Sequence, residues 1–85
     1  MSSSPSVYWT EIDGQRCLAI RFVGTLDAGG ARAALDDVRA ALGDRDEKIT
    51  MIWNAAEMDG YETEARTLWQ HGMAELEPRI HAILR

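Results

Sequence analysis

The sequence is poor in several residue types on which particular functions depend. Cys17 is the only cysteine among 85 residues, so neither an internal disulfide nor a cluster of thiolate metal ligands can form. Because Cys17 lies in an apolar run, we expect it to be a small buried hydrophobe. Lys48 is the only lysine, and 9 basic residues stand against 14 acidic ones. A net charge of -5 with scattered arginines argues against a nucleic-acid partner, because phosphate binding needs clustered cations.

Signals for export, membrane insertion and catalysis are also missing. The sequence starts without the basic and apolar regions of a signal peptide, and no apolar run approaches the length of a membrane span. We therefore expect a protein of the reducing cytoplasm. No G-x-S-x-G, H-E-x-x-H or phosphate-loop motif occurs, and His71, Glu75 and His81 are expected to be solvated. The sequence predicts no enzyme, no metal site and no cofactor.

What remains is the composition of one small globular domain. Apolar residues make up 46% and charged residues 27%, and the chain is too short for a second core. Residues 1–6 are rich in serine and are expected to form a disordered tail. Residues 7–85 are expected to form a single domain.

A β-hairpin is predicted near the start of this domain. Residues 7–12 and 16–23 are β-prone, and the Asp13-Gly14 step between them is typical of a type I′ turn. A two-residue turn sets Glu11 opposite Arg16, where we expect a cross-strand ion pair.

Two helices are predicted from apolar stripes with helical spacing. The first begins after Asp27 as N-cap and ends at Gly43, and the second begins around residues 62–64 and ends before Pro78. The first stripe is Ala31, Ala34, Leu35, Val38 and Leu42, and the second is Ala65, Leu68, Trp69, Gly72, Met73 and Leu76.

Two further strands complete the expected order. Residues 49–53 are apolar apart from Thr50, as in a strand buried on both faces, and residues 80–84 begin a last strand. The order β-β-α-β-α-β predicts an α/β fold, with a four-stranded mixed sheet covered on one face by two helices.

An acidic run marks the junction between the third strand and the second helix. Glu57, Asp59, Glu62 and Glu64 fall within eight residues and enclose no positive charge. One interpretation is that these carboxylates only cap the helix and offset its dipole. The other interpretation adds the recognition of a partner. Partners bind at the carboxyl ends of parallel strands, and Tyr61 at this place resembles an interface anchor.

Two tryptophans suggest an alternative site. Trp53 and Trp69 each sit in an apolar pattern typical of a core. Together with Met73 they would also line a pocket for a small apolar ligand or lipid, between the second helix and the sheet.

The chain resembles the STAS domain superfamily, which includes the anti-sigma factor antagonists of bacterial sporulation. The resemblance rests on the order of elements, on Gly24-Thr25-Leu26-Asp27 leading into the first helix, and on the stretch from Ile52 to Trp69. It looks most like a divergent branch of antagonist-like domains. The resemblance implies a non-enzymatic regulatory module that binds a protein partner, such as a kinase-like protein. We expect the recognition surface to consist of the start of the first helix and of residues at the junction before the second helix: Met58, Asp59, Gly60, Tyr61, Glu62, Thr63, Glu64 and Arg66.

The sequence departs from the family in two respects. Phosphorylated antagonists carry Asp-Ser-Ser-Gly where this chain has Tyr61-Glu62-Thr63-Glu64, so Thr63 is the candidate phosphoacceptor. Family members also continue with further structure after the strand that here ends at Arg85. We expect the uncovered edge to favour a homodimer or a partner chain.

Overall fold

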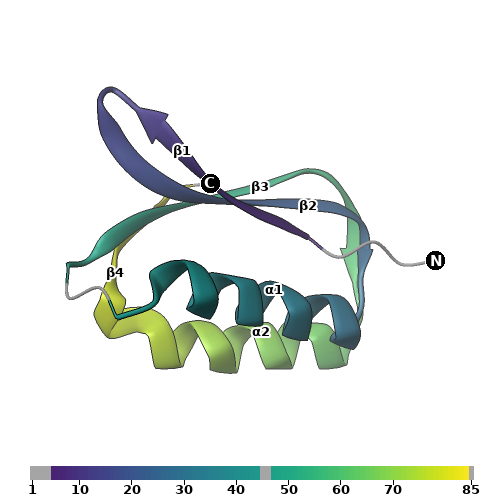
Figure 1. The fold of residues 1–85 in the computed structure, drawn as a ribbon. Helices are drawn as coiled ribbons and strands as arrows, with labels where there is room; N and C mark the ends of the chain where they lie inside the picture. Colours follow the sequence, from purple (N-terminus) through teal and green to yellow (C-terminus); the bar gives the residue numbers. More distant parts are fainter. Residues whose placement is uncertain (1–4, 45–46, 85) are drawn as a thin grey trace.

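The computed structural model describes residues 5–44 and 47–84, and it has the predicted α/β architecture. Figure 1 shows a twisted sheet with both helices packed beneath one face. The elements are β1 (Ser6–Ile12), β2 (Gln15–Leu26), α1 (Ala28–Leu42), β3 (Ile49–Tyr61), α2 (Thr63–Leu76), the 3₁₀ turn η1 (Glu77–Arg79) and β4 (Ile80–Leu84). The sheet order is β1-β2-β3-β4, with β1 antiparallel to β2 and the other pairs parallel.

The opening hairpin turns at the predicted place. Asp13 and Gly14 have φ angles of 52° and 81°, the left-handed values that a type I′ turn requires. Glu11 lies opposite Arg16, but the predicted ion pair between them is wrong. The Arg16 guanidinium instead lies over the Trp9 ring, with 4.4 Å between its Cζ and the ring centroid. An exposed ion pair stabilises little, whereas stacking on an indole also covers apolar surface.

The predicted disordered tail is too long. Residues 1–4 lie outside the described part of the chain, but Ser6 already belongs to β1, where it pairs with Arg21. Pro5 is buried, and a Cβ built on Gly30 would lie 3.6 Å from its Cδ. The proline therefore packs against the first turn of α1.

Both ends of α1 are capped as predicted. The Asp27 carboxylate accepts a hydrogen bond of 2.7 Å from the Gly30 amide. Gly43 has a φ of 52° and donates its amide to the Arg39 carbonyl at 3.0 Å. The Arg79 guanidinium then donates to the Gly43 carbonyl at 2.7 Å, which ties the end of α1 to η1.

The core lies between the sheet and the two helical stripes, as expected. Gly72 lets the helices approach closely, because a Cβ at this position would stand 2.6 Å from Cδ1 of Leu35. Cys17 is buried, at 2% exposure, as predicted. The largest fully buried side chains are Leu18, Ile20, Leu42, Met51 and Val38.

Strand β3 is much longer than predicted. It runs to Tyr61 rather than ending at residue 53, because β2 also continues and pairs with it through Leu26. Low strand propensity in this acidic stretch is overridden by pairing with β2. Two register irregularities interrupt the pairing. Strand β4, in contrast, pairs only with Ile49–Ile52. Among the described residues, the later part of β3 therefore has a strand on one side, β2.

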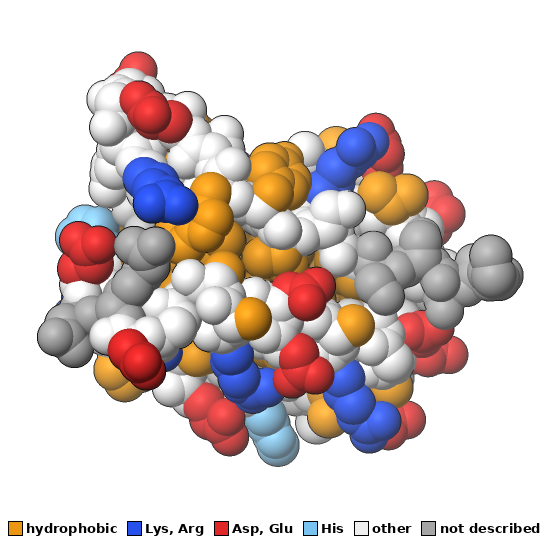
Figure 2. All heavy atoms as spheres, in the orientation of Figure 1, with side chains coloured by type: hydrophobic (Ala, Val, Ile, Leu, Met, Phe, Trp, Pro, Cys, Tyr) orange, Lys and Arg blue, Asp and Glu red, His pale blue; other side chains and the backbone are white. Residues whose placement is uncertain are grey.

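The surface of the helical layer mixes both signs of charge. Figure 2 shows acidic and basic side chains interspersed there, with apolar surface between the helices and the sheet. The exposed large apolar side chains Tyr8, Ile12 and Val23 lie on the strands of the sheet. Within residues 5–44 and 47–84, neither helix is long and apolar enough to cross a membrane.

Candidate functional site

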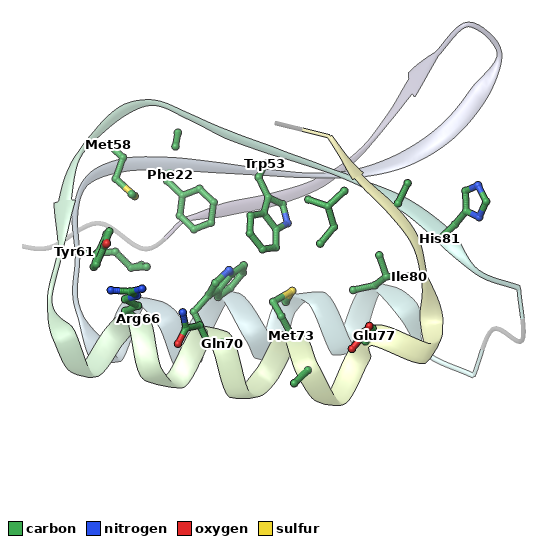
Figure 3. Close-up of a pocket in the computed structure, with 16 residues that line it drawn as sticks. Phe22, Trp53, Met58, Tyr61, Arg66, Gln70, Met73, Glu77, Ile80 and His81 are labelled. Carbon is green, nitrogen blue, oxygen red and sulfur yellow. The ribbon is translucent and has the colours of Figure 1, made fainter.

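An apolar groove lies between α2 and the sheet, on the side where β4 leaves β3 uncovered. Its volume is about 860 Å³. Strands β2, β3 and β4 supply one wall, and α2 with η1 supplies the other (Figure 3). The apolar lining includes Phe22, Trp53, Met58, Trp69, Met73 and Ile83.

Three aromatic rings form the middle of the groove. Trp69 of α2 meets Trp53 of β3 edge to face, with 5.7 Å between ring centroids. It meets Phe22 of β2 in the same way at 5.4 Å. Trp69 is 8% exposed and belongs to the core, while Trp53 is partly buried against it. The two interpretations of the tryptophans are therefore compatible, and Trp53, Trp69 and Met73 line one groove.

Tyr61 and Arg66 lie together at one end of the groove. Tyr61 is the last residue of β3 and is 51% exposed. Arg66 stands on the first turn of α2, with its Cζ 5.9 Å from the centroid of the Tyr61 ring. Within the described part of the chain, Arg66 forms no ion pair. This end therefore presents a guanidinium positioned by an aromatic ring.

The opposite end of the groove carries different polar groups. Glu77 of η1 and His81 of β4 line it, and both are exposed. Figure 3 shows Glu77 near Ile80 at the end away from Arg66, with Gln70 and Met73 between them on α2. The groove is thus mainly apolar in the middle, where Gln70 is a neutral polar side chain, with the Arg66 guanidinium at one end and Glu77 and His81 at the other.

Arginines that the fold brings close offset part of the negative charge of the acidic junction. The Glu57 carboxylate lies 2.6 Å from the Arg21 guanidinium, and Glu64 lies 3.8 Å from Arg32. Asp59 and Glu62 are exposed and have no arginine or lysine within ion-pair distance among the described residues. Two of the four carboxylates are therefore compensated by arginines distant in the sequence.

The capping role of the junction also differs from the prediction. Glu62 is the N-cap of α2, but its side chain makes no capping hydrogen bond. Its backbone amide instead donates to the Leu26 carbonyl at 2.9 Å, which joins the ends of β2 and β3. Glu64 is the acidic residue of the first helical turn, where it is placed to offset the helix dipole.

The structure divides the predicted partner-binding residues into two groups. Met58, Tyr61 and Arg66 face the groove. The others stand at the junction outside the groove lining: Asp59, Gly60, Glu62, Thr63 and Glu64. Thr63 is exposed at the first position of α2, and its role as a phosphoacceptor stays a prediction.

Sequence reasoning named Arg66 and Met73 as site residues but missed Gln70 and Glu77 on the same side of the groove. Arg66, Gln70, Met73 and Glu77 follow one another at intervals of four, three and four residues, so they share one side of a helix. This spacing was readable beside the apolar stripe. The sequence did not indicate that β4 is too short to cover this side of α2.

The candidates for metal binding do not come together. Glu75 pairs with Arg39 at 3.5 Å, and His71 is exposed beside it on α2. Within the parts of the chain that the structure describes, no three His, Cys, Asp or Glu side chains gather as metal ligands.

Comparison with known proteins shows the fold. No family model matches the sequence, and no curated protein matches it. A solved structure from Shewanella loihica matches with a TM-score of 0.82 and 17% identity, over 98% of this chain and 69% of that chain. The matching protein is an uncharacterized member of the DUF3478 family with a SpoIIAA-like fold. The present chain therefore has a SpoIIAA-like fold, the STAS-type architecture that its sequence resembles.

Proposed function

We propose that this chain is a non-enzymatic regulatory module that captures a protein partner where β2 and β3 run into α1 and α2. The observation that carries the proposal is Tyr61, which is 51% exposed at the carboxyl end of β3 with Arg66 against its ring. Tyrosine and arginine are common anchors of protein interfaces. Open α/β sheets bind ligands and partners at the carboxyl ends of their parallel strands.

The fold supports this function by analogy. A SpoIIAA-like architecture suggests the superfamily of the anti-sigma factor antagonists, which act by binding regulatory proteins. Because one fold serves many functions, the chemistry of this corner of the molecule, formed by Asp59, Tyr61, Glu62 and Arg66, carries more weight than the fold.

Charge at the corner indicates the character of the partner. Asp59 and Glu62 flank Tyr61 and carry the negative charge that the arginines leave uncompensated. Such a rim accelerates the approach of a basic surface and disfavours acidic ones. We therefore expect the partner to present basic residues around a pocket for an aromatic ring.

The test is a quantitative pull-down of the partner with matched variants. Tyr61→Ala combined with Glu62→Ala should abolish capture while leaving the circular dichroism spectrum unchanged. Tyr8→Ala combined with Glu11→Ala removes the same residue types from exposed positions of β1 and should capture normally. Capture that survives the first pair of changes rules out this corner as the binding site.

A second function is supported by the groove. We propose that the domain alternatively carries or senses a small apolar ligand between α2 and the sheet. The volume of about 860 Å³ is typical of sites for small molecules, and aromatic and sulfur-containing side chains line it. A ligand beside Trp53 and Trp69 should shift tryptophan emission and raise the melting temperature. Absence of both changes across a panel of apolar compounds would exclude this function.

A further inference from the structure

We propose that the groove binds a free fatty acid, with its carboxylate at Arg66 beside Tyr61 and its acyl chain along Trp53, Trp69 and Met73. This inference rests on the second proposed function. It adds the chemical class of the ligand and its orientation.

The distribution of polar groups along the groove sets the orientation. Figure 3 shows Arg66 and Tyr61 at one end, Glu77 at the other, and Trp53 and Met73 between them. A carboxylate at the Glu77 end would meet a like charge that lines the groove, whereas at the Arg66 end it would meet a guanidinium that lines the groove, with the carboxylates of Asp59 and Glu62 outside the lining. The middle is mainly apolar and, apart from the neutral Gln70, offers no charged partner to a head group, so it suits a hydrocarbon chain.

Arg66 has the properties of an anion-binding residue. Arg32 and Arg39, the other arginines on the helices, each face a carboxylate within 4 Å, at 3.8 Å for Arg32 and 3.3 Å for Arg39. Arg66 makes no such pair within the described residues, and the Tyr61 ring lies beside its guanidinium. A guanidinium held in this way can donate two parallel hydrogen bonds to one carboxylate.

The length of the groove suits a single acyl chain. At a rise of 1.5 Å per residue, Met73 lies roughly 10 Å from Arg66 along α2, and Glu77 lies roughly 16 Å from it. This is comparable to an extended chain of medium length. The rim and the net charge of -5 argue against docking to an anionic bilayer, because such surfaces attract clustered cations. The ligand is therefore a free fatty acid rather than a membrane lipid.

The test compares three amphiphiles with the same chain and different head groups, the two charged ones below their critical micelle concentrations and the alcohol below its solubility limit. Laurate carries an anion, lauryl alcohol is neutral, and dodecylammonium carries a cation. Titration calorimetry and tryptophan emission measure binding to the full chain. We expect laurate to bind about tenfold more tightly than the alcohol, a preference typical of a charge-assisted hydrogen bond. The ammonium compound should bind most weakly.

Variants of the chain test separately where the head group and the hydrocarbon tail of the ligand bind. Arg66→Gln should reduce laurate affinity to that of the alcohol and leave alcohol binding unchanged. Arg32→Gln removes a similarly exposed guanidinium outside the groove and should bind laurate normally. Ala74→Phe narrows the groove and should weaken both ligands, whereas Ala40→Phe on the exposed side of α1 should weaken neither.

The outcomes separate this inference from the proposed functions. Equal affinity for laurate and lauryl alcohol would overturn the carboxylate site at Arg66 and leave the apolar-ligand function standing. No binding of any of the three would overturn both. Binding only to laurate-containing vesicles, or loss of partner capture in Ala74→Phe without amphiphile binding, would assign the groove to a membrane or to a protein and overturn the fatty-acid site.

Discussion

The indole rings of Trp53 and Trp69 meet edge to face, with 5.7 Å between their centroids and 65° between their planes. One ring belongs to β3 and the other to α2, so this contact joins the sheet to a helix. The same rings line the groove. Stability and the proposed ligand binding therefore depend on the same two side chains, and experiments on either property must measure both.

Removing Trp69 should destabilise the domain strongly. Trp69→Ala loses the ring contacts with Trp53 and Phe22 and leaves a cavity in the core. We expect the free energy of unfolding to fall by about 3–5 kcal/mol in urea denaturation. Trp69→Phe keeps an aromatic ring and should cost clearly less. A loss below about 1 kcal/mol for Trp69→Ala would mean that the indole is not packed as described.

We expect Gly72 to tolerate no side chain, because Leu35 occupies the space that a Cβ would need. A Cβ on Gly72 would stand 2.6 Å from Cδ1 of Leu35. Alanine at this position gains about 1 kcal/mol in helix propensity but forces the helices apart, so we expect a net loss of about 1–2 kcal/mol. In Leu35→Ala, which lacks the clashing atoms, the Gly72→Ala change should be much less harmful. Additive effects in this double-mutant cycle would contradict the close approach.

The cap of α1 should contribute a smaller, local amount. Asp27→Ala removes the acceptor for the Gly30 amide at 2.7 Å and should lower the free energy of unfolding by about 1 kcal/mol. Asp27→Asn keeps an oxygen acceptor and should retain most of that stability. The comparison is made by thermal and urea denaturation of the three proteins side by side. Equal destabilisation by both changes would indicate that the charge, not the hydrogen bond, matters.

The two proposed surfaces overlap at Tyr61 and Arg66, so their occupants should exclude one another. With the partner immobilised, saturating laurate should reduce capture of the chain several-fold, whereas lauryl alcohol should reduce it less because it does not need Arg66. By linkage, the partner should weaken laurate binding by the same factor. Capture that is unaffected by a saturating ligand would place the partner elsewhere.

Local patterns in the sequence predicted much of the fold. The Asp13-Gly14 turn fixed the hairpin register, since residues within a short loop determine the pairing. The apolar stripes of both helices predicted the buried faces, because helical spacing is a local property. The extension of β3 to Tyr61 could not be predicted in this way. It depends on pairing with the end of β2, a contact between residues distant in the sequence.

The candidate site was predicted in two separate parts. The sequence indicated a recognition surface around Tyr61 and a pocket around Trp69, with no relation between them. The structure joins them because β3 carries Trp53 and Tyr61 along one wall, opposite Arg66 and Trp69 on α2. The pairing of Glu57 with Arg21 was equally hidden, because Arg21 lies on the neighbouring strand.

Because β4 is short, the two parts of β3 differ in the number of strands they pair with. Along Ile49–Ile52, β3 pairs with a strand on each side, but its described residues beyond Ile52 pair with β2 alone. That part of β3 is tied to α2 by the contacts of Trp53 with Trp69 and of Tyr61 with Arg66, so the wall of the groove without a second neighbouring strand is held by side chains.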